Sequence, residues 1–263
     1  MTLTDTPTTR VLDWEGCFNV RDLGGLTTAG GQRVRWGALV RADLLARLTE
    51  SGRQSLLDHG VRTIVDLRFP DEVAKDWEAY PFKDTDETEH GVRYANVPFN
   101  TGRDPQDEAH LRAAYASATT RLELNRHDID WHPVGIATAV AAIADAREGG
   151  VLVHCHAGKD RTGAVVGLVL SALGVPDEDI AEDYAMTALT LEPLIVEWLD
   201  SHTQDPDERE RMRALAMPVR EAMLDTLSYV REKHGSAEEF LINGGVTRDH
   251  LAALRARLLV EVE

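Results

Sequence analysis

The sequence of 263 residues contains only two cysteines, Cys17 and Cys155. Two cysteines cannot supply the set of disulfides that stabilises small secreted domains. With no paired CxxC motif and no histidine cluster beside them, they also make a poor zinc site, so we expect no metal and no other cofactor. Cys155 is therefore expected to be a free thiol, and Cys17 is expected to be a packing residue.

Long apolar runs are also missing. No segment approaches the roughly 20 consecutive apolar residues of a membrane-spanning helix. The first ten residues, MTLTDTPTTR, lack the charged start and the apolar run of an export signal. We therefore expect a cytoplasmic protein without stable membrane insertion, and a disordered tail over residues 1–9.

Basic residues are scarce relative to acidic ones. The chain has 28 lysines and arginines against 45 aspartates and glutamates, which gives a formal net charge of -17. Such a surface repels nucleic acid and anionic membranes, so no nucleic-acid partner is expected and any basic site must be local. The 43% of apolar residues can form a substantial core. Because no long Pro/Gly/Ser linker interrupts the chain, we predict one domain over 1–263, and the sequence leaves the oligomeric state open.

Strand and helix patterns alternate along the chain. Strand-like runs cover 33–43, 61–68, 92–99 and 151–154, and helical spacing covers 48–60, 107–125, 133–148, 177–200 and 207–234, followed by two short helices that Ser236 and Thr247 can cap. This alternation predicts an α/β fold with a mostly parallel central sheet flanked by helices. Beyond Gly174 the chain reads as entirely helical.

The segment HCHAGKDRTG, residues 154–163, joins the strand ending at His154 to a helix beginning near Arg161. The backbone N–H groups of 156–161 would then surround one point at a helix N-terminus, an arrangement that binds a phosphate dianion. The helix dipole and nearby cations would lower the pKa of the Cys155 thiol from about 8.5 into the range of roughly 3.5 to 7.5 seen for activated cysteines. The predicted phosphate-binding residues are His156, Ala157, Gly158, Lys159, Asp160, Arg161 and Thr162.

Individual residues of this segment have distinct expected roles. The planar guanidinium of Arg161 can fold over the loop and hold two phosphoryl oxygens, and Gly158 permits a tight turn. Thr162 offers a hydroxyl to the sulfur. A lone cysteine at the end of a strand is more often a packing residue. The combination of Gly, Lys, Asp, Arg and Thr at set offsets favours a reactive site instead.

The same segment resembles the signature of the cysteine-dependent phosphatases, and more narrowly that of the atypical bacterial protein tyrosine phosphatases with dual protein and phosphoinositide activity. The resemblance extends to FNVRDLGG (18–25), GALVRADLLARLT (37–49), GVRTIVDLR (60–68), ALGVPDEDIAEDYAMT (172–187) and GSAEEFLINGGVTRDHLAALRARLL (235–259), and it is weakest over 70–150 and 190–230. It implies a tyrosine-phosphatase-like fold and hydrolysis of phosphoric monoesters through a phosphocysteine, with inorganic phosphate as product. Within FNVRDLGG, Arg21 and Asp22 are expected to pair with each other or to brace the loop, and Gly24 and Gly25 to adopt positive φ.

The resemblance also implies that Cys155 is the nucleophile, Arg161 the phosphate ligand and Asp160 the general acid. The chain has no Trp-Pro-Asp tripeptide, so the acid stays open between Asp160, Asp71 in FPD, Asp128 or Asp130 in RHDIDWHP, and a water molecule. A bound phosphate dianion would raise the pKa of a carboxyl that Arg161 otherwise lowers. Asp66 and Arg68 follow a strand and are expected to brace the site.

Substrates and alternatives also follow from the residues. Lys159 is typical of lipid phosphatases in the same superfamily, so phosphoinositides stand beside phosphotyrosine, phosphoserine and phosphothreonine as candidate substrates. The resemblance also implies that the helices over about 190–234 can form a lid on the pocket; the alternative is that they pack as ordinary core. Two other classes are open: a sulfurtransferase, and a phosphate-binding module without activity. A protective Cys17–Cys155 disulfide is a further hypothesis.

Overall fold

The computed structural model describes residues 9–82, 91–99 and 105–262. Its main sheet has five strands in the order β1-β3-β6-β4-β5, and a second sheet pairs β2 with β7. The strands are β1 (Arg21–Asp22), β2 (Arg33–Val34), β3 (Leu39–Ala42), β4 (Val61–Asp66), β5 (Arg93–Asn96), β6 (Gly150–His154) and β7 (Leu259–Val260). Only β1 runs antiparallel to its neighbour in the main sheet, which confirms the predicted mostly parallel α/β fold.

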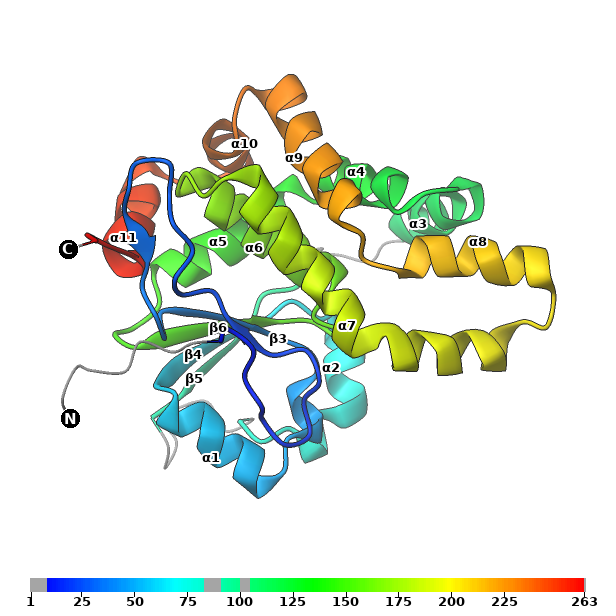
Figure 1. Cartoon of the computed structure of the whole chain (residues 1–263), viewed down its shortest axis with the longest axis horizontal. Coiled ribbons are helices and arrows are strands. Elements are labelled where there is room, and N and C mark those ends of the chain that lie inside the picture. Colours follow the sequence, from blue (N-terminus) through cyan, green and yellow to red (C-terminus); the bar gives the residue numbers. More distant parts are fainter. Residues whose placement is uncertain (1–8, 83–90, 100–104, 263) are drawn as a thin grey trace.

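Helices cover both faces of the main sheet (Figure 1). They are α1 (Glu50–Asp58), α2 (Pro70–Asp76), α3 (Pro105–Ser117), α4 (Arg121–Trp131), α5 (Pro133–Ala144), α6 (Asp160–Ala172), α7 (Asp177–His202), α8 (Pro206–Ala216), α9 (Arg220–His234), α10 (Ala237–Gly244) and α11 (Arg248–Leu258), with two short 3-10 turns, η1 (Leu45–Arg47) and η2 (Trp77–Ala79). In Figure 1, α1 and α2 lie on one side of the sheet, and α5, α6 and the later helices lie on the other. The second part of α7 and all of α8 project from the body as a helical hairpin.

Several element boundaries differ from the predicted ones. The run 33–43 divides into β2 and β3 because Gly37 has a positive φ of 72° and turns the chain between them. The range 107–125 contains two helices, since α3 ends at Ser117 and Thr120 caps the start of α4 through its side chain. The range 207–234 also contains two, α8 and α9, separated at Pro218 and Val219. Residues 1–8 of the predicted tail lie outside the described residues.

Two hydrophobic clusters hold the layers together. The larger one joins the face of the sheet carrying Val153 to α5, α6, α7, α9 and α10. The smaller one joins the opposite face to α1 through side chains such as Leu56 and Leu152. Alternate residues of a strand point to opposite faces, so β6 contributes to both clusters and is buried throughout. The strand that leads into the predicted site is therefore anchored on both sides.

The parallel register brings the ends of four strands to one edge of the sheet. Ala42 of β3 is paired with His154 of β6, His154 with Asp66 of β4, and Asp66 with Asn96 of β5. In open α/β sheets, ligands bind beyond the carboxyl ends of such strands. The loop after His154 thus lies where the fold is expected to place a binding site.

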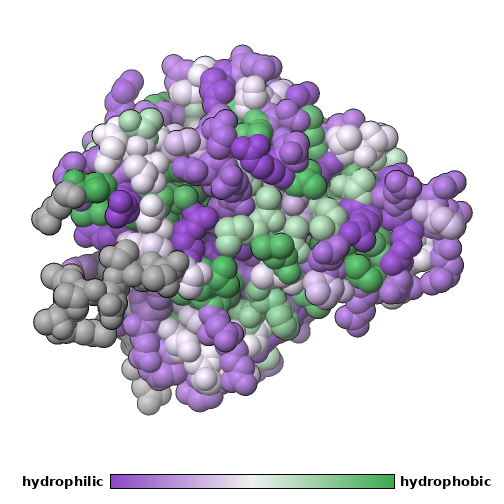
Figure 2. Space-filling view, viewed as in Figure 1, coloured by the Kyte–Doolittle hydropathy of each residue, from purple (hydrophilic) through white to green (hydrophobic). Residues whose placement is uncertain are grey.

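The surface is mostly hydrophilic on the face shown in Figure 2, with hydrophobic side chains gathered toward the middle of that face. Among the described residues, no helix has both the length and the apolar character needed to cross a lipid bilayer. The prediction of one domain over 1–263 stays a prediction.

Candidate active site

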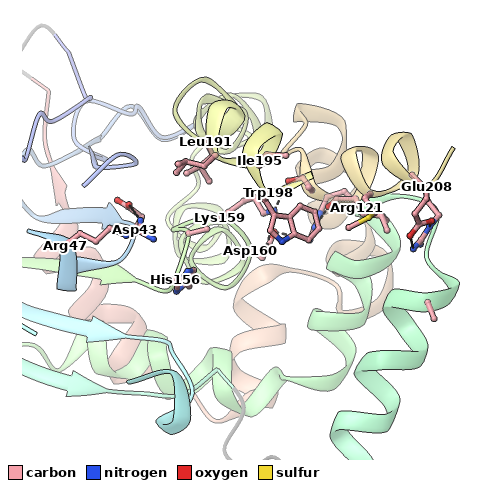
Figure 3. A pocket seen from close by; sticks show the side chains of 17 residues that line it. Asp43, Arg47, Arg121, His156, Lys159, Asp160, Leu191, Ile195, Trp198 and Glu208 are labelled. Atoms are coloured by element: carbon pink, nitrogen blue, oxygen red, sulfur yellow. Dashed lines mark hydrogen bonds and ion pairs between the residues drawn. The ribbon is translucent and has the colours of Figure 1, made fainter. Parts of the chain in front are cut away.

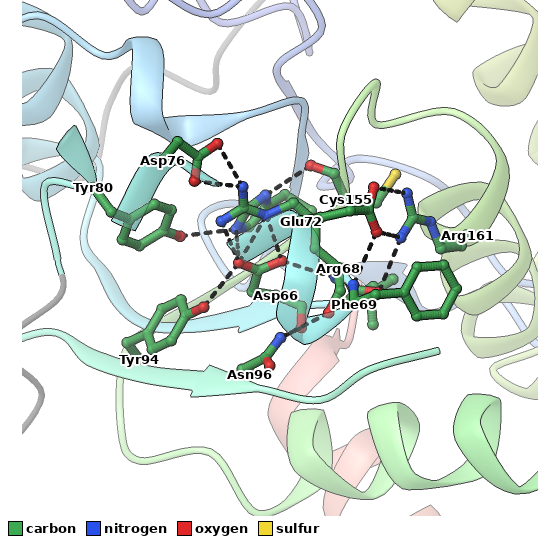
Figure 4. A network of polar contacts seen from close by, with 12 residues as sticks. Asp66, Arg68, Phe69, Glu72, Asp76, Tyr80, Tyr94, Asn96, Cys155 and Arg161 are labelled. Carbon is green, nitrogen blue, oxygen red and sulfur yellow. Dashed lines mark hydrogen bonds and ion pairs between the residues drawn. The ribbon is translucent and has the colours of Figure 1, made fainter. Parts of the chain in front are cut away.

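Cys155 follows β6 directly, and α6 begins five residues later at Asp160. Its side chain is only 3% exposed, so the sulfur lies at the bottom of the turn rather than on the surface. Figure 4 shows this sulfur beside the guanidinium of Arg161. The predicted order of strand, turn and helix is confirmed.

Three successive backbone carbonyls of the turn, those of residues 156–158, accept hydrogen bonds from donors outside it. The carbonyl of His156 accepts from the Leu44 amide at 3.0 Å. Asn19 Nδ2 donates to the carbonyls of Ala157 and Gly158 at 2.9 and 3.2 Å, and Arg41 Nη2 donates to Gly158 at 2.8 Å. In a trans peptide the N–H points away from the preceding carbonyl. The outer hydrogen bonds therefore turn the amides of 157–159 toward the interior of the turn.

Those amides are available to a ligand. Within the described part of the chain, the N–H groups of residues 156–161 donate no hydrogen bond. They precede and begin α6, whose dipole adds partial positive charge at the same point. Donors that converge on one point at a helix N-terminus form an anion-binding site, so the geometry agrees with the predicted phosphate cradle.

Gly158 is needed for this turn. Its φ is +64°, a conformation that side chains rarely adopt. A Cβ at this position would also lie 2.4 Å from the carbonyl oxygen of Ala42. The turn packs against the end of β3 too closely to accept any other residue.

Arg161 is oriented by the segment that follows β4. Its two terminal nitrogens bind both carboxylate oxygens of Glu72 at 2.5 and 2.9 Å, and its guanidinium lies 4.9 Å from the ring centre of Phe69 (Figure 4). Burial acts to lower the pKa of Arg161, but the hydrogen bonds to Glu72 and the nearby charge of Cys155 raise it overall. Arg161 is therefore a permanent cation beside the sulfur, and Glu72 is a positioning residue that sequence analysis missed.

Replacing Glu72 by glutamine is expected to lower kcat/KM about 10-fold, because the bidentate ion pair that orients Arg161 is lost. The affinity for inorganic phosphate or vanadate should fall in parallel, an effect that loss of packing alone would not cause. Steady-state kinetics and inhibition constants measure both quantities. Lys75→Gln, on the exposed side of the same helix, is the matched control. Unchanged phosphate affinity in Glu72→Gln would contradict the positioning role.

Asp66 and Arg68 form a buried ion pair behind the loop. Arg68 binds Asp66 at 2.8 Å and Asp76 at 2.8 Å, and both Asp66 and Arg68 are fully buried. Tyr94 donates to Asp66 at 2.9 Å. Burial favours the neutral carboxyl of Asp66, but the nearby His154 and Arg68 lower its pKa overall. This network supports the ends of β4, β5 and β6, which agrees with the bracing role predicted for Asp66 and Arg68.

A second buried network braces the turn from the opposite side. Asp183 of α7 binds Arg21 at 3.2 Å and Arg41 at 2.7 Å, and Arg41 in turn reaches the carbonyl of Gly158. Arg21 also donates to the side-chain oxygen of Asn19, the residue that binds the Ala157 and Gly158 carbonyls. Burial lowers the pKa of Arg21 to about 10. Sequence analysis missed this network because Asp183 lies more than 140 positions from both arginines.

The prediction that Arg21 and Asp22 pair with each other is wrong. Asp22 instead accepts from the amides of Gly24 and Gly37 and binds His59, while Arg21 binds Asp183. Arg21 does brace the loop through Asn19, as the second expectation had it. Gly25 has the predicted positive φ of 86°, whereas Gly24 does not and is glycine because a Cβ would meet Trp36.

Asp160 lies at the first turn of α6 between cations. Its carboxylate binds Arg121 of α4 at 3.0 Å and Lys159 at 3.5 Å. Burial would raise its pKa, but Arg121, Lys159 and Arg161 lower it overall. The carboxylate is therefore ionised at neutral pH without ligand. Arg121 lowers the pKa of Asp160 more than Arg161 does, although the sequence had pointed only to Arg161.

The alternative acids lie elsewhere. Asp71 is on the exposed first turn of α2. Asp130 binds Tyr229 and Lys233 of α9. Asp128 lies beside His127 on α4. Of these four aspartates, only Asp160 lines the large cavity next to the loop.

Asp43 is a fifth candidate that sequence analysis did not consider. It lines the same cavity and accepts from the amides of Phe18 and Asn19, each at 3.1 Å. Burial raises its pKa despite these hydrogen bonds. A carboxyl with a raised pKa is suited to donate a proton. Asp43 therefore has to be compared with Asp160 in any test of the acid.

The cavity has a volume of about 690 Å³ and opens beside the loop (Figure 3). Its walls combine charged side chains with an apolar side formed by α7 and α8. The residues that line it are Asp43, Arg47, Ala116, Arg121, His156, Ala157, Lys159, Asp160, Leu191, Leu194, Ile195, Trp198, Glu208, Arg211, Met212, Leu215 and Ala216. Such a pocket accepts an anionic group at one end and apolar surface along one side.

Two cations of the cavity are tied to the end of α8. Lys159 Nζ donates to the carbonyl of Ala216 at 2.7 Å, and Arg121 donates to the carbonyl of Leu215. Lys159 is buried rather than solvated at the surface, and this burial lowers its pKa. The last carbonyls of a helix carry partial negative charge and attract cations.

The helices predicted as a lid divide into two parts. The second half of α7 and α8 line the cavity. By contrast, α9 contributes Met223, Leu227 and Val230 to the main core. The predicted range of about 190–234 is therefore too long at its C-terminal end, because the apolar face of α9 packs against the body of the protein.

Two smaller expectations concern groups near the sulfur. The Thr162 hydroxyl is buried without a hydrogen-bond partner among the described residues, so the predicted bond to Cys155 is absent in this structure. Both cysteines are free. Cys17 lies near the carbonyl of Leu44, and burial raises the pKa of its thiol, as expected for a packing residue.

Comparisons with known proteins agree with this geometry. A model of the family described as "Tyrosine phosphatase family" matches residues 12–260. A Cupriavidus necator protein named as a tyrosine-protein phosphatase is 35% identical over 180 residues, which span 66% of this chain and 61% of that protein. A tyrosine-protein phosphatase of Nostoc commune is 27% identical over 237 residues, 84% of this chain and 74% of the relative. The triple specificity protein phosphatase PtpB of Mycobacterium tuberculosis is 30% identical over 192 residues, 66% and 68% of the two chains.

Proposed function

This chain belongs to the tyrosine phosphatase family, and from that premise we propose that it hydrolyses phosphotyrosine monoesters through a phosphocysteine intermediate without a metal ion. The observation that carries the proposal is the set of unbonded amides of residues 156–161 around Cys155, with Arg161 held beside the sulfur by Glu72. This arrangement matches the charge of a phosphoryl group in its transition state. All three relatives bear phosphatase names, which supports the same reaction class.

The reaction proceeds in two balanced steps. In the first, the Cys155 thiolate attacks phosphorus, the S–P bond forms, the P–O bond to the leaving group breaks, and an acid gives its proton to the leaving oxygen. In the second, water attacks phosphorus and the S–P bond breaks. The carboxylate takes a proton from the water, and the products are inorganic phosphate and the free Cys155 thiolate. The amides and Arg161 hold the equatorial oxygens in both steps.

We assign the proton transfer to Asp160. Of the aspartates considered from sequence, it alone lines the cavity, and it lies at the first turn of the helix that follows the phosphate cradle. Without ligand, Arg121 and Lys159 keep it ionised. A bound phosphate dianion opposes these cations and raises the pKa of Asp160, so the acid is competent only in the loaded enzyme.

Asp160→Asn is expected to lower kcat about 100-fold on a phosphotyrosine peptide, since a general acid contributes roughly 10²–10⁴-fold. The loss should be much smaller with p-nitrophenyl phosphate, whose leaving group needs little protonation. Parallel kinetics of Asp43→Asn provide the comparison. A leaving-group-dependent loss in Asp43→Asn, and not in Asp160→Asn, would transfer the role to Asp43.

The test of the proposed function is capture of the intermediate. Full-length protein is incubated with a phosphotyrosine peptide and EDTA, quenched in acid and digested. The peptide containing Cys155 should gain the mass of one phosphoryl group. Turnover with EDTA but with no phosphoryl-cysteine would overturn the mechanism. Sulfur transfer from thiosulfate without phosphatase activity would indicate a sulfurtransferase, and phosphopeptide binding without turnover would indicate a silent binding module.

Phosphoinositides are a second candidate substrate, supported by the extra cations in the cavity. The side chains of Lys159, within the predicted phosphate cradle, and of Arg121 and Arg47, outside it, line the cavity and can meet additional phosphates on an inositol ring. The phrase "triple specificity" in the name of the Mycobacterium relative is consistent with broad substrate use by that protein. A panel of phosphorylated peptides, including phosphoserine and phosphothreonine, and inositol lipids assayed without metal would rank the substrates.

The second half of α7 together with α8 is proposed as a lid. In this structure Lys159 and Arg121 bind the last carbonyls of α8 and so hold that helix against the cavity. A bound phosphoryl group would compete with these carbonyls for the same two cations. Proteolysis within 201–211 should therefore change in rate when vanadate occupies the site. Cleavage that is indifferent to vanadate would count against a lid. A cytoplasmic location and the absence of a nucleic-acid partner stay predictions.

A further inference from the structure

A cluster of three ligand-type side chains lies at the end of α4, outside the cavity of the proposed reaction. The nitrogens of His127 and His132 and a carboxylate oxygen of Asp128 lie within 4.8 Å of one another. His127 and Asp128 belong to the last turns of α4, and His132 ends that helix and precedes α5. None of the three lines the large cavity beside Cys155.

His127 is the unusual member of this cluster. Its side chain is only 10% exposed, and neither ring nitrogen has a hydrogen-bond partner among the described residues. A buried polar group without a partner costs about 1–3 kcal/mol, so buried imidazoles normally have one. The nearest charged oxygen is that of Asp128, 3.7 Å from Nδ1, which is too far for a hydrogen bond. Among the described residues, the His127 imidazole therefore has no group that satisfies its two nitrogens.

We propose that His127, Asp128 and His132 bind a divalent late transition metal, with Zn²⁺ as the representative ion. Imidazole nitrogen and carboxylate oxygen are both ordinary zinc ligands, at about 2.0–2.2 Å from the metal. In a tetrahedral site such bonds place ligand atoms about 3.3–3.5 Å apart, so the three side chains have to close by at most about 1.5 Å. Three protein ligands leave the fourth position to water.

The surroundings of the cluster suit a bound cation. His110 and Trp131 stack with ring centres 3.6 Å apart, and His127 stacks on His110 at 4.9 Å, so aromatic rings shield one side. Phe99 packs against the ring of His132 at 5.2 Å. Apolar rings around a site exclude water and strengthen the metal–ligand interaction. The prediction of no metal rested on the lack of a paired CxxC motif and of a histidine cluster beside the two cysteines, and His127 and His132 lie far from both cysteines in the sequence.

The cluster is connected to the proposed active site along α4 and through a small internal cavity that Asp128 and Asp160 both line. The first residue of that helix, Arg121, binds Asp160 and the carbonyl of Leu215, whereas the metal would join its last turn to the start of α5. Bound metal should therefore raise the thermal stability of the folded chain, since any ligand that binds only the folded state does so. It takes no part in phosphoryl transfer, so the proposal is independent of the proposed function.

The test is a titration of the full-length Cys155→Ser variant with Co²⁺ and Zn²⁺ after removal of metals with a chelating resin. The serine removes the active-site thiol as a competing ligand. Visible absorption should show one Co²⁺ bound per chain, displaced by one equivalent of Zn²⁺, and Zn²⁺ should raise the Tm. Fluorescence of Trp131, next to the site, should be quenched by Co²⁺.

Single substitutions identify which residues bind the metal ion. In the same Cys155→Ser protein, His127→Gln, Asp128→Asn and His132→Gln should each weaken Co²⁺ binding at least about 10-fold, since even outer partners of metal ligands contribute 10–100-fold. Circular dichroism confirms that each variant is folded. His202→Gln is the control, because this exposed histidine packs against a different tryptophan, Trp198. Binding that survives in His127→Gln and is lost in His202→Gln, or no stoichiometric binding at all, would overturn the site.

Discussion

Cys155→Ser is expected to lower phosphatase turnover at least about 10⁴-fold while leaving the fold intact. Serine occupies nearly the same volume, but its hydroxyl is not ionised at neutral pH and is a far weaker nucleophile than a thiolate. Removal of a nucleophile typically leaves only the residual catalysis from binding and charge stabilisation. Initial rates on a phosphotyrosine peptide measure the effect.

The same variant separates binding from chemistry. The amides of residues 156–161 and the side chain of Arg161 are unchanged by Cys155→Ser, so affinity for the phosphorylated peptide should be kept or increased. Isothermal titration with the peptide checks this expectation, and thermal unfolding serves as the folding control. Turnover near the wild-type rate would show that another group is the nucleophile.

Asp183→Asn is expected to destabilise the protein by about 3–5 kcal/mol. The carboxylate lies between Arg21 and Arg41, and all three side chains are at most 2% exposed. Removing one partner of a buried ion pair leaves uncompensated charge in a region of low dielectric. Urea denaturation at neutral pH measures the loss. Glu182→Gln, an exposed neighbour on the same helix, is the control and should change stability by less than about 0.5 kcal/mol.

The effect of Asp183 should depend on pH. Burial would raise its pKa, but Arg21, Arg41 and Arg10 lower it below the usual range of an aspartate. A group whose pKa is lowered by folding stabilises the protein above its unfolded pKa and loses that contribution as pH falls through the folded value. The difference between wild type and Asp183→Asn should therefore be constant from pH 5 to 7 and shrink below about pH 4. A difference that grows in acid would contradict the ionised state of Asp183.

Asp183→Asn should also weaken phosphate binding, because Arg41 reaches both Asp183 and the carbonyl of Gly158. Without the carboxylate, Arg41 loses the contact that aims it at the turn. The Ki of vanadate against a phosphotyrosine peptide, compared with that of Glu182→Gln, measures this second effect. An unchanged Ki would show that the network stabilises the fold without shaping the cradle.

Local sequence was sufficient to predict the loop after His154 and many of the helices and strands. The strand ending at His154, the turn with Gly158 and the helix carrying Arg161 are encoded within a few consecutive residues, so propensity and spacing indicate them directly. Thr49 capping α1 and Ser236 capping α10 are equally local. Over 107–125 the sequence predicted one helix where the structure has two. The second of them, α4, begins after its capping residue Thr120.

The amino-acid sequence by itself determined the α/β fold, the strand, turn and helix around Cys155 and the family resemblance, because these depend on neighbouring residues and on the 2.0 and 3.6 periodicities. Only the tertiary structure decided that Glu72 orients Arg161, that Arg121 ionises Asp160, and that Asp183 supports Gly158 through Arg41. Each of these contacts joins residues that are far apart in the chain. The spacing of charged residues along the sequence does not indicate which of them form ion pairs. The pairs are set by how the helices and strands pack.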